Sequence, residues 1–245
     1  MILEVKNLYK KFGSVVAANN INFNMKKGEI IGIIGSNGAG KTTFCNMITG
    51  YTKSDSGEIY LNKKNITNNS VQDIKSLGMH RSFQIPQVFE NLSVLENVII
   101  SHLVAQKKQN NFFDNALNDQ NILLANDILY KFNLIGSKER KVKDLPQGIR
   151  KVLDIIIAIQ GDPSIILLDE PTSGISSDEK NKVMQNIIST LEVLNISVIF
   201  IEHDMEIIEG FSKRVVAFYN GEIIADGNSK EVLLKKDVKK YIVGN

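Results

Sequence analysis

The chain of 245 residues has a single cysteine, Cys45. One thiol cannot form an internal disulfide, so a cross-linked scaffold is excluded and a reducing compartment is indicated. Long apolar runs are also missing. No window approaches the ~20 apolar residues of a membrane-spanning helix, and the first residues, MILEVKNLYKKF, include no stretch of signal-peptide length. We therefore expect a protein that neither leaves the cell nor spans a membrane by itself.

The chain also lacks a strong charge of either sign. Its 29 lysines and arginines nearly balance its 27 aspartates and glutamates, and the net charge of +2 is too small to indicate nucleic acid as a partner. The hydrophobic share of 43% and the charged share of 23% are those of an ordinary soluble globular protein. A chain of this length can bury one good core, or a core and a small satellite domain.

The apolar pattern predicts two kinds of strand. Residues 21–25, INFNM, alternate apolar and polar side chains, and residues 57–62 behave similarly, which is the period of a half-buried antiparallel strand. Near-continuous apolar runs are typical of parallel strands covered on both faces. Such runs occupy residues 28–35, 164–169 and 197–202. We expect these three runs to form a central sheet.

Helical spacing and turn residues organise the rest of the chain. Residues 176–195 repeat apolar side chains at helical spacing behind a Ser/Asp start, which predicts a crossover helix between two parallel strands. Asn220-Gly221 lies between two apolar runs and predicts a hairpin. Residues 229–243 are expected to close the chain as a short helix. Two amphipathic helices around a polar loop, with no parallel strand, predict a helical insertion between residues 88 and 160.

The stretch GSNGAGKT, residues 35–42, fits the phosphate-loop pattern G-x-x-x-x-G-K-[ST] between a buried strand and a helix that begins near Lys41. Its glycines allow backbone N–H groups to turn inward, and the helix N-terminus adds partial positive charge. Lys41 is placed to reach the β- and γ-phosphates, and Thr42, or Thr43 beside it, offers a hydroxyl to Mg²⁺. The nucleotide-binding residues predicted here are Gly35, Ser36, Asn37, Gly38, Ala39, Gly40, Lys41, Thr42 and Thr43.

Residues 164–170, SIILLDE, supply the carboxylates that a phosphate loop needs. Asp169 ends a buried strand, where it can hold Mg²⁺ through water. Glu170 follows at once, and adjacent acids at a strand end point to different sides. Glu170 can therefore face the γ-phosphate and orient or deprotonate the attacking water. A solvated turn is the plain alternative for a lone Asp-Glu pair, but the apolar run before it favours the chemical roles.

These motifs, in this order, resemble the ATP-binding subunits of ABC transporters, and more narrowly the ATPases of branched-chain amino-acid and amide-type importers. The resemblance runs from KKFG to the final KKYIVGN. It implies an α/β fold with a P-loop, RecA-like core, an antiparallel β-subdomain and a helical subdomain insertion. Residues 1–245 would form one ABC ATPase domain, with 1–87 and 160–245 as the catalytic core and β-subdomain and 88–159 as the helical subdomain.

The resemblance also implies roles for residues outside the phosphate loop. Phe12, in KKFG, matches the aromatic residue that stacks on adenine. Gln84 would contact Mg²⁺ or the water and sense the membrane subunit, and His203, in IEHDM, would hydrogen-bond the γ-phosphate. SGISSDE, residues 173–179, takes the D-loop position, although Ser176 stands where many relatives have aspartate. The implied catalytic residues are Glu170, His203, Gln84 and Lys41, and the implied metal ligands are Thr42, Gln84 and Asp169.

The stretch LPQGIRK, residues 145–151, opens an apolar helix and resembles the ABC signature motif. A helix N-terminus is an anion site, and this one would grip the γ-phosphate held by a second subunit, through Pro146, Gln147 and Gly148. Pro146 replaces the usual serine and donates no hydrogen bond, so the contact would rest on Gly148 and the N–H groups after it. The amino-acid and amide branch often lacks the serine too. We expect Arg150 and Lys151 at the first exposed positions of this helix.

The resemblance implies ATP and Mg²⁺ as cofactors and a dimer that sandwiches two ATP molecules head to tail. A homodimer and a heterodimer both remain open. Further partners would be transmembrane permease subunits, which hold the chain at the cytoplasmic face of the membrane, and indirectly an extracytoplasmic substrate-binding protein. The apolar strip Pro86, Val88, Phe89 and Leu92 is either a docking groove for the permease or part of the core.

Two alternatives are weighed against this function. A soluble ABC ATPase acting on DNA or ribosomes usually carries long coiled-coil insertions or two nucleotide domains, and neither is present. A GTPase requires N-K-x-D for guanine, but NKKN at residues 62–65 ends in Asn65 and lacks that carboxylate. The cargo, whether a branched-chain amino acid or a related amide, is not specified by this chain.

Overall fold

The fold is described from a computed structural model of the chain, which covers residues 1–82, 87–106 and 118–243. Its first layer is a four-stranded antiparallel sheet in the order β2-β1-β4-β5. The strands are β1 (Leu3–Phe12), β2 (Val15–Met25), β4 (Ser56–Leu61) and β5 (Lys64–Asn65). The two alternating segments predicted as antiparallel strands lie in β2 and β4, as expected from their period.

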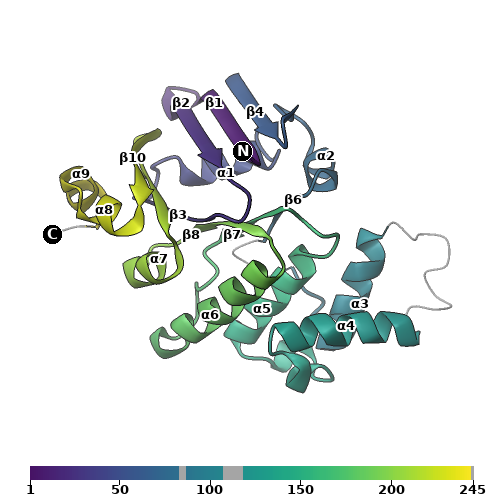
Figure 1. The fold of residues 1–245 in the computed structure, drawn as a ribbon. Helices are drawn as coiled ribbons and strands as arrows, with labels where there is room; N and C mark the ends of the chain where they lie inside the picture. Colours follow the sequence, from purple (N-terminus) through teal and green to yellow (C-terminus); the bar gives the residue numbers. More distant parts are fainter. Residues whose placement is uncertain (83–86, 107–117, 244–245) are drawn as a thin grey trace.

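A six-stranded sheet forms the centre of the molecule, in the order β10-β9-β3-β8-β7-β6 (Figure 1). All neighbours pair in parallel except β9 and β10, which form the predicted hairpin around Asn220-Gly221. The strands are β3 (Ile30–Gly35), β6 (Met79–Arg81), β7 (Ile165–Asp169), β8 (Ser197–Ile201), β9 (Arg214–Tyr219) and β10 (Glu222–Asn228). The three apolar runs are β3, β7 and β8. Strand β6 was not predicted.

Helices cover both faces of the central sheet. In Figure 1, α1 lies between the two sheets, whereas α5, α6 and α7 lie on the opposite side of the central sheet, and α3 and α4 extend from that side. The helices are α1 (Lys41–Ile48), α2 (Val71–Ser76), α3 (Val94–Ala105), α4 (Asp119–Lys131), α5 (Gln147–Ala158), α6 (Ser177–Val193), α7 (Met205–Phe211), α8 (Ser229–Leu234) and α9 (Lys236–Val238). Short 3₁₀ turns occupy Ile135–Ser137 and Val142–Asp144, and a π-helical turn occupies Lys239–Val243.

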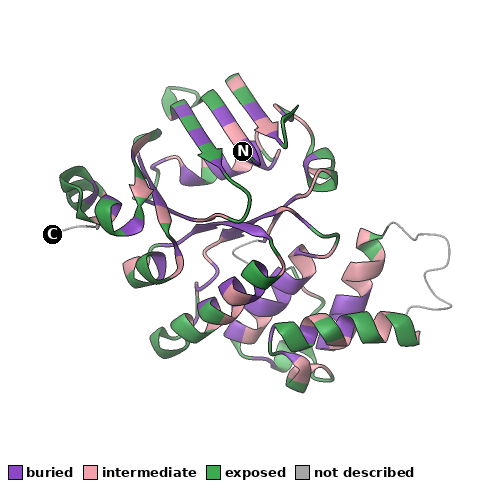
Figure 2. Ribbon diagram, in the orientation of Figure 1, coloured by how far each residue is buried: buried purple, intermediate pink, exposed green. Residues whose placement is uncertain are grey.

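Alternation along the central strands divides the apolar interior into two cores. In β8, for example, Val198 and Phe200 face the helices, whereas Ile199 and Ile201 face α1 and the antiparallel sheet. The continuous purple of these strands in Figure 2 shows that both faces are covered. This double burial explains why the strands read as unbroken apolar runs. It also fixes the strand ends, where the polar residues of the candidate site begin.

The sequence specifies several helix starts through side chains. Ser93 and Glu96 form a capping box at the start of α3, because Ser93 Oγ accepts from the Glu96 N–H and Glu96 accepts from the Ser93 N–H. Helix α5 begins differently. Its N-cap is Pro146, which makes no side-chain cap hydrogen bond. Pro146 therefore offers the first turn of α5 its backbone carbonyl, which accepts from the Ile149 and Arg150 N–H groups, but no side-chain oxygen.

Two predictions need correction. Lys151 is only 2% exposed, so its predicted position on the surface of α5 is wrong, and Arg150 is half-buried. The closing segment is not one helix. Lys235 adopts an extended backbone that ends α8 and starts α9, which buries Val238 and lets Tyr241 stack on Tyr219 with ring centroids 4.4 Å apart. In both cases the contact partner lies about 20 residues away in the sequence: Lys151 contacts Glu170 and Ser173, and Tyr241 contacts Tyr219.

Cys45 is fully buried in α1, and burial raises the pKa of its thiol to about 12. A thiol with this pKa stays protonated and unreactive at neutral pH. This environment fits a structural role for Cys45. Among the described residues, no helix combines the length and apolar character that crossing a membrane requires.

Candidate nucleotide-binding site

The predicted phosphate loop connects the end of β3 to the start of α1 through tightly packed glycines. Gly40 has φ +100°, and a Cβ atom on it would overlap the carbonyl oxygen of Ala17. A Cβ atom on Gly35 would lie 2.6 Å from the carbonyl oxygen of Phe218. Only glycine fits at these two points without displacing backbone. The loop is therefore shaped by its neighbours as well as by its own sequence.

Backbone hydrogen bonds hold the loop between the two sheets. The N–H of Gly221, in the β9–β10 turn, donates to the carbonyl of Ala39 at 3.0 Å. The N–H of Asn19, in β2, donates to the carbonyl of Gly221 at 2.8 Å. The predicted Asn-Gly hairpin turn therefore links the phosphate loop to the antiparallel sheet.

Lys41 begins α1 and points back over the loop. Its Nζ donates to the carbonyls of Gly35, at 2.5 Å, and Ser36, at 3.0 Å. Burial lowers the pKa of Lys41, and the carboxylates of Glu170 and Asp169 act in the opposite direction. A partly desolvated ammonium attracts a phosphate oxygen more strongly than an ammonium in water does.

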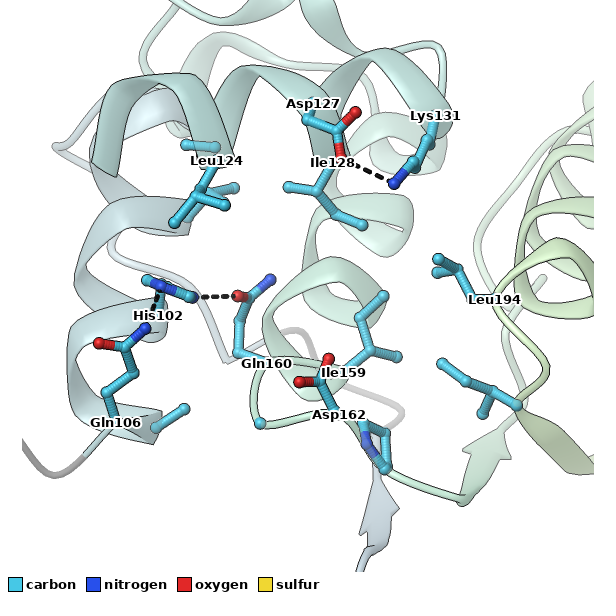
Figure 3. A pocket seen from close by; sticks show the side chains of 16 residues that line it. His102, Gln106, Leu124, Asp127, Ile128, Lys131, Ile159, Gln160, Asp162 and Leu194 are labelled. Carbon is cyan, nitrogen blue, oxygen red and sulfur yellow. Dashed lines mark hydrogen bonds and ion pairs between the residues drawn. The ribbon is translucent and has the colours of Figure 1, made fainter. Parts of the chain in front are cut away.

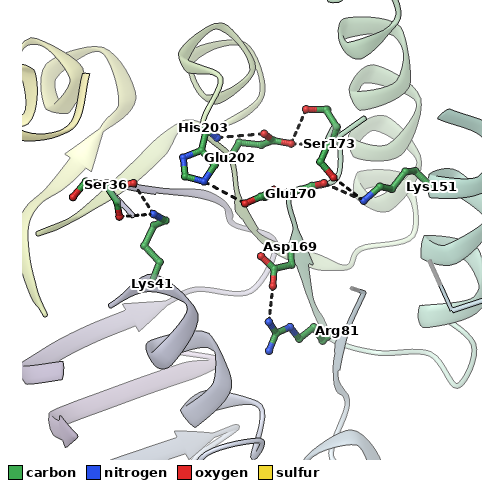
Figure 4. A network of polar contacts seen from close by, with 11 residues as sticks. Ser36, Lys41, Arg81, Lys151, Asp169, Glu170, Ser173, Glu202 and His203 are labelled. Carbon is green, nitrogen blue, oxygen red and sulfur yellow. Dashed lines mark hydrogen bonds and ion pairs between the residues drawn. The ribbon is translucent and has the colours of Figure 1, made fainter. Parts of the chain in front are cut away.

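A cavity of about 180 Å³ opens beside the loop and collects many of the predicted residues. Lys41, Glu170 and His203 are among its lining residues, and Figure 4 shows the polar contacts of these three side chains. Its lining consists of Val15, Ala17, Asn37, Gly38, Ala39, Gly40, Lys41, Thr42, Thr43, Asp169, Glu170, Ile201 and His203. Residues predicted from three separate segments thus meet at the carboxyl ends of β3, β7 and β8.

Asp169 ends β7, and its carboxylate is held by an arginine for which the sequence motifs predict no role. Arg81, in β6, donates to Asp169 Oδ2 at 2.5 Å and to Asn46 Oδ1 of α1 at 2.6 Å. The guanidinium thus joins three elements around the carboxylate. A hydroxyl from Thr42 or Thr43 and the Asp169 carboxylate are hard oxygen ligands, and this donor set suits Mg²⁺.

Glu170 has a backbone conformation that few residues other than glycine adopt, with φ +49°. Its N–H donates to the carbonyl of Ile201 at 3.1 Å, which ties the turn to the end of β8. Its Oε1 lies 3.2 Å from Nε2 of His203. The two side chains meet across the ends of β7 and β8, and both line the cavity.

The turn after Glu170 is fixed by a second, buried carboxylate. Glu202 is 5% exposed, and its Oε1 accepts from the N–H of Thr172 at 2.8 Å and from the Thr172 hydroxyl at 2.7 Å. Burial raises the pKa of Glu202, although the Thr172 hydrogen bonds oppose that rise. The N–H of His203 also points to Glu202, at 3.3 Å from Oε2. Glu202 thus connects the turn after β7 to the histidine after β8.

Phe12 ends β1 and is 49% exposed, so its ring is accessible to a ligand. The ammonium of Lys10 lies 5.2 Å from the centre of that ring. Lys10 is itself anchored, because its Nζ donates to Asp55 Oδ1 at 2.7 Å, while the Lys11 N–H donates to Oδ2 of the same carboxylate. These hydrogen bonds with Lys10 and Lys11 lower the pKa of Asp55.

The predicted signature residues lie apart from this cavity. Pro146, Gln147 and Gly148 are not among its lining residues, and α5 lies on the opposite side of the central sheet from α1 (Figure 1). Pro146 and Gln147 are exposed, whereas Gly148 is buried against Val183 and Ile175. Ser176, of the predicted D-loop, is the N-cap of α6. Gln84 and Pro86 lie outside the described residues.

Three polar residues near the site carried no motif signal: Arg81, Lys151 and Glu202. Arg81 lies in the short stretch before the predicted Gln84, and Glu202 immediately precedes the predicted His203. Their proximity to motif residues is the one signal that was available. Lys151 was predicted at the exposed surface of α5, but the structure buries it.

A second cavity, of about 380 Å³, lies among α3, α4 and the segment after α5 (Figure 3). His102 Nδ1 lies 3.2 Å from Gln160 Oε1 inside it, and Asp127 pairs with Lys131 on α4. None of the site residues predicted from the sequence is among those that line it. Within the described parts of the chain, no cluster of three or more His, Cys, Asp or Glu residues could hold a metal.

A glycine-shaped loop, a lysine and a strand-end carboxylate at one sheet edge define a P-loop nucleotide-binding protein. A family model described as ABC transporter matches residues 18–173. The chain therefore belongs to the ABC transporter family, and it is an ATPase. This agrees with the resemblance drawn from the motifs.

Individual relatives match almost end to end. The probable branched-chain amino acid transport ATP-binding protein LivG of Methanocaldococcus jannaschii is 31% identical over 234 residues, which cover 94% of this chain and 91% of the relative. The high-affinity branched-chain amino acid transport ATP-binding protein LivG of Escherichia coli K12 is 29% identical over 251 residues, covering 99% and 98%. The likeness therefore includes the helical segment and the C-terminal region as well as the phosphate loop.

Solved structures confirm the fold class. An ATP-binding cassette of an ABC transporter in its ADP conformation superposes with a TM-score of 0.86 at 30% identity, covering 97% of this chain and 96% of the other. A dimeric structure of a bacterial ABC transporter cassette superposes with a TM-score of 0.76 at 25% identity, covering 93% and 98%. The α/β fold with its antiparallel sheet and added helices is thus confirmed. The subdomain boundaries at residues 87/88 and 159/160 stay a prediction.

Replacing Gly40 with alanine should damage the site through sterics alone. The Cβ would overlap the Ala17 carbonyl, so we expect the loop to shift, with nucleotide affinity reduced at least about tenfold, or ~1.4 kcal/mol. Isothermal titration calorimetry with ATP measures this. Gly28→Ala is the matched control, since Gly28 also has a positive φ, +78°, but nothing lies within 4 Å of an added Cβ. Equal affinity losses in both variants would contradict the steric account.

Proposed function

We propose that this chain is the ATP-binding and ATP-hydrolysing subunit of an ABC importer for branched-chain amino acids or related amides. The observation that carries the ATPase part is the meeting of Lys41, Asp169, Glu170 and His203 around one cavity. The near end-to-end match to the LivG relatives supports the transport part. The relatives found give no support to a soluble ABC ATPase that acts on DNA or ribosomes.

The nucleotide would bind along the phosphate loop. Backbone N–H groups of residues 35–43 would surround the phosphates, and Lys41 would exchange its two carbonyl contacts for β- and γ-phosphate oxygens. Phe12 would hold the adenine at the other end. Thr42 or Thr43, Asp169 and Gln84 would hold Mg²⁺, which supplies charge neutralisation at the phosphates when bound.

Glu170 would act on the attacking water, and His203 would position the γ-phosphate. The 3.2 Å contact between their side chains keeps both groups on the same side of the cavity. A carboxylate at this point can accept a proton from water while Lys41 stabilises charge on the phosphate oxygens.

The signature residues would serve the nucleotide of a second ATPase subunit. Helix α5 starts at an exposed end, and none of its first residues lines this chain's own cavity. Its free N–H groups and dipole favour an anion there. A head-to-tail dimer supplies that anion twice, once from each bound ATP. The dimeric cassette structure among the relatives supports such a pairing, and a homodimer and a heterodimer both fit.

The permease would dock beside the segment that follows Gln84. Phe89 is 57% exposed, and Val88 and Leu92 are half-buried next to the start of α3. An exposed aromatic side chain on a half-buried apolar base suits an apolar helix of a membrane subunit. This contact would hold the chain at the cytoplasmic face of the membrane. An extracytoplasmic binding protein would act through the permease.

Transport itself is tested by isolating the chain with its partners. Affinity purification from native membranes is expected to bring down hydrophobic permease subunits and any second ATPase. Vesicles carrying that complex should then take up a branched-chain amino acid or a related amide only when ATP is supplied. Recovery of a DNA- or ribosome-bound complex in place of permeases would contradict the importer assignment.

Glu170→Gln should keep ATP binding and lower hydrolysis at least about 100-fold, because the amide cannot accept the water's proton. With ATP and magnesium the variant should accumulate as a closed dimer, visible by gel filtration. The unsubstituted chain under the same conditions is the control. A variant that stays monomeric while binding ATP would count against the role of Glu170.

Pro146→Ser tests the trans site. Pro146 has φ −56° and ψ 153°, which serine adopts without strain at an N-cap, and a serine hydroxyl could cap the first turn of α5. ATP affinity of the substituted chain should therefore not change, whereas hydrolysis at the partner's site should stay equal or rise. Calorimetry and turnover assays separate the two effects. A drop in the chain's own ATP affinity would show that α5 serves the cis site.

A further inference from the structure

Lys151 is a buried cation close to the site, and the assigned motifs leave it without a role. It lies in the first turns of α5, three residues after Gly148, and is 2% exposed. Its Nζ donates to the backbone carbonyl of Glu170 at 3.3 Å and to the Ser173 hydroxyl at 3.1 Å (Figure 4). A lysine buried this deeply is uncommon and needs such partners.

Burial and nearby carboxylates act on the pKa of this ammonium in opposite directions. Burial lowers the pKa of Lys151, while the carboxylates of Asp154, Glu202, Glu170 and Asp169 oppose that fall. Asp154 lies on the same helix and accepts from the Gln87 N–H at 2.8 Å. Helix α5 is thereby joined to both the segment after the predicted Gln84 and the turn after β7.

The turn that Lys151 contacts needs external support. Glu170 has φ +49°, a left-handed conformation that is strained for a residue other than glycine. The N–H of Glu170 donates to the Ile201 carbonyl, and the carbonyl of Glu170 accepts from the Ser173 N–H at 3.1 Å. Lys151 is the second donor to that carbonyl. Removing this donor would free the peptide that determines where the Glu170 carboxylate points.

We propose that Lys151 is a positioning residue for hydrolysis. Its ammonium holds the backbone carbonyl of Glu170 so that the carboxylate faces the attacking water, and this contact connects the turn of Glu170 to helix α5. This rests on the proposed function of Glu170. Because α5 begins with the residues that would grip the partner's ATP, one side chain links the hydrolytic group of one site to the signature contact of the other. A shift of α5 on dimer closure is then transmitted to Glu170.

The link predicts a specific kinetic signature. A misplacement of a catalytic group by about 1 Å lowers turnover about 100-fold without removing a substrate contact. Lys151 touches no residue of the phosphate loop in the contacts described. Its loss should therefore lower kcat and leave the affinity for ATP unchanged.

The test uses the full chain in its ATPase assembly with Lys151→Met, which keeps the length of the stem and removes the ammonium. We expect kcat to fall about 100-fold while the Kd for a fluorescent ATP analogue and the KM change less than about twofold. Lys151→Arg, which keeps a donor, should restore kcat to within about threefold. Lys131→Met on α4 is the control for loss of a lysine, with kcat unchanged.

Parallel variants separate this inference from the role of Glu170. If Glu170→Gln keeps full turnover, the assignment of Glu170 fails and this inference fails with it. If Glu170→Gln is inactive, the double variant with Lys151→Met should be no slower, because both act through one carboxylate. A Lys151→Met variant with normal kcat, or one that loses ATP affinity in proportion to kcat, would overturn the positioning role.

Ser173→Ala provides a second measurement that does not depend on burying a new side chain. It removes the hydroxyl that accepts from the ammonium, so kcat should fall about threefold and circular dichroism should be unchanged. If Lys151→Met does not fold, this variant and Lys151→Arg decide the matter. Normal turnover in Ser173→Ala together with inactive Lys151→Arg would then refute the proposal.

Discussion

The close approach of the phosphate loop to the backbone on either side of it is the constraint on which the rest of the structure depends. Gly40 lies against the Ala17 carbonyl of β2, and Gly35 lies against the Phe218 carbonyl of β9. The Gly221 N–H completes the contact at Ala39. Because side chains are excluded here, the antiparallel sheet and the central sheet meet at the loop itself. The orientation of Phe12 relative to Lys41 follows from that junction.

The sequence predicted those parts of the fold that have a local cause. Strands β7 and β8 are covered on both faces, so they were predicted from their continuous apolar sequence, and Asn220-Gly221 predicted the hairpin. Strand β6 was missed because its three residues carry no period, and its pairing with β7 depends on a segment more than 80 residues away. The break at Lys235 was missed for a similar reason, since the stacking partner of Tyr241 lies in β9.

In the site, too, residues with a local sequence signal were predicted, whereas residues whose contacts join distant segments were missed. The phosphate-loop and strand-end motifs indicated Lys41, Asp169 and Glu170, the family resemblance indicated His203, and the structure brings the four together at one sheet edge. It could not indicate Arg81 or Glu202, because the contacts of these residues with Asp169 and Thr172 join separate strands. Lys151 was assigned to the surface by its charge, although its acceptors lie about 20 residues further along the chain. The signature roles and Gln84 stay predictions, since they concern a second subunit and residues outside those described.

The lysine beside Phe12 has a consequence for how a base is recognised. Because Asp55 anchors Lys10 with its ammonium 5.2 Å from the ring centre, one face of the aromatic ring already has a cation against it. A flat heterocycle can then stack on the opposite face alone. A purine stacked on Phe12, as we propose, would therefore lie on the face of the ring away from the Lys10 ammonium.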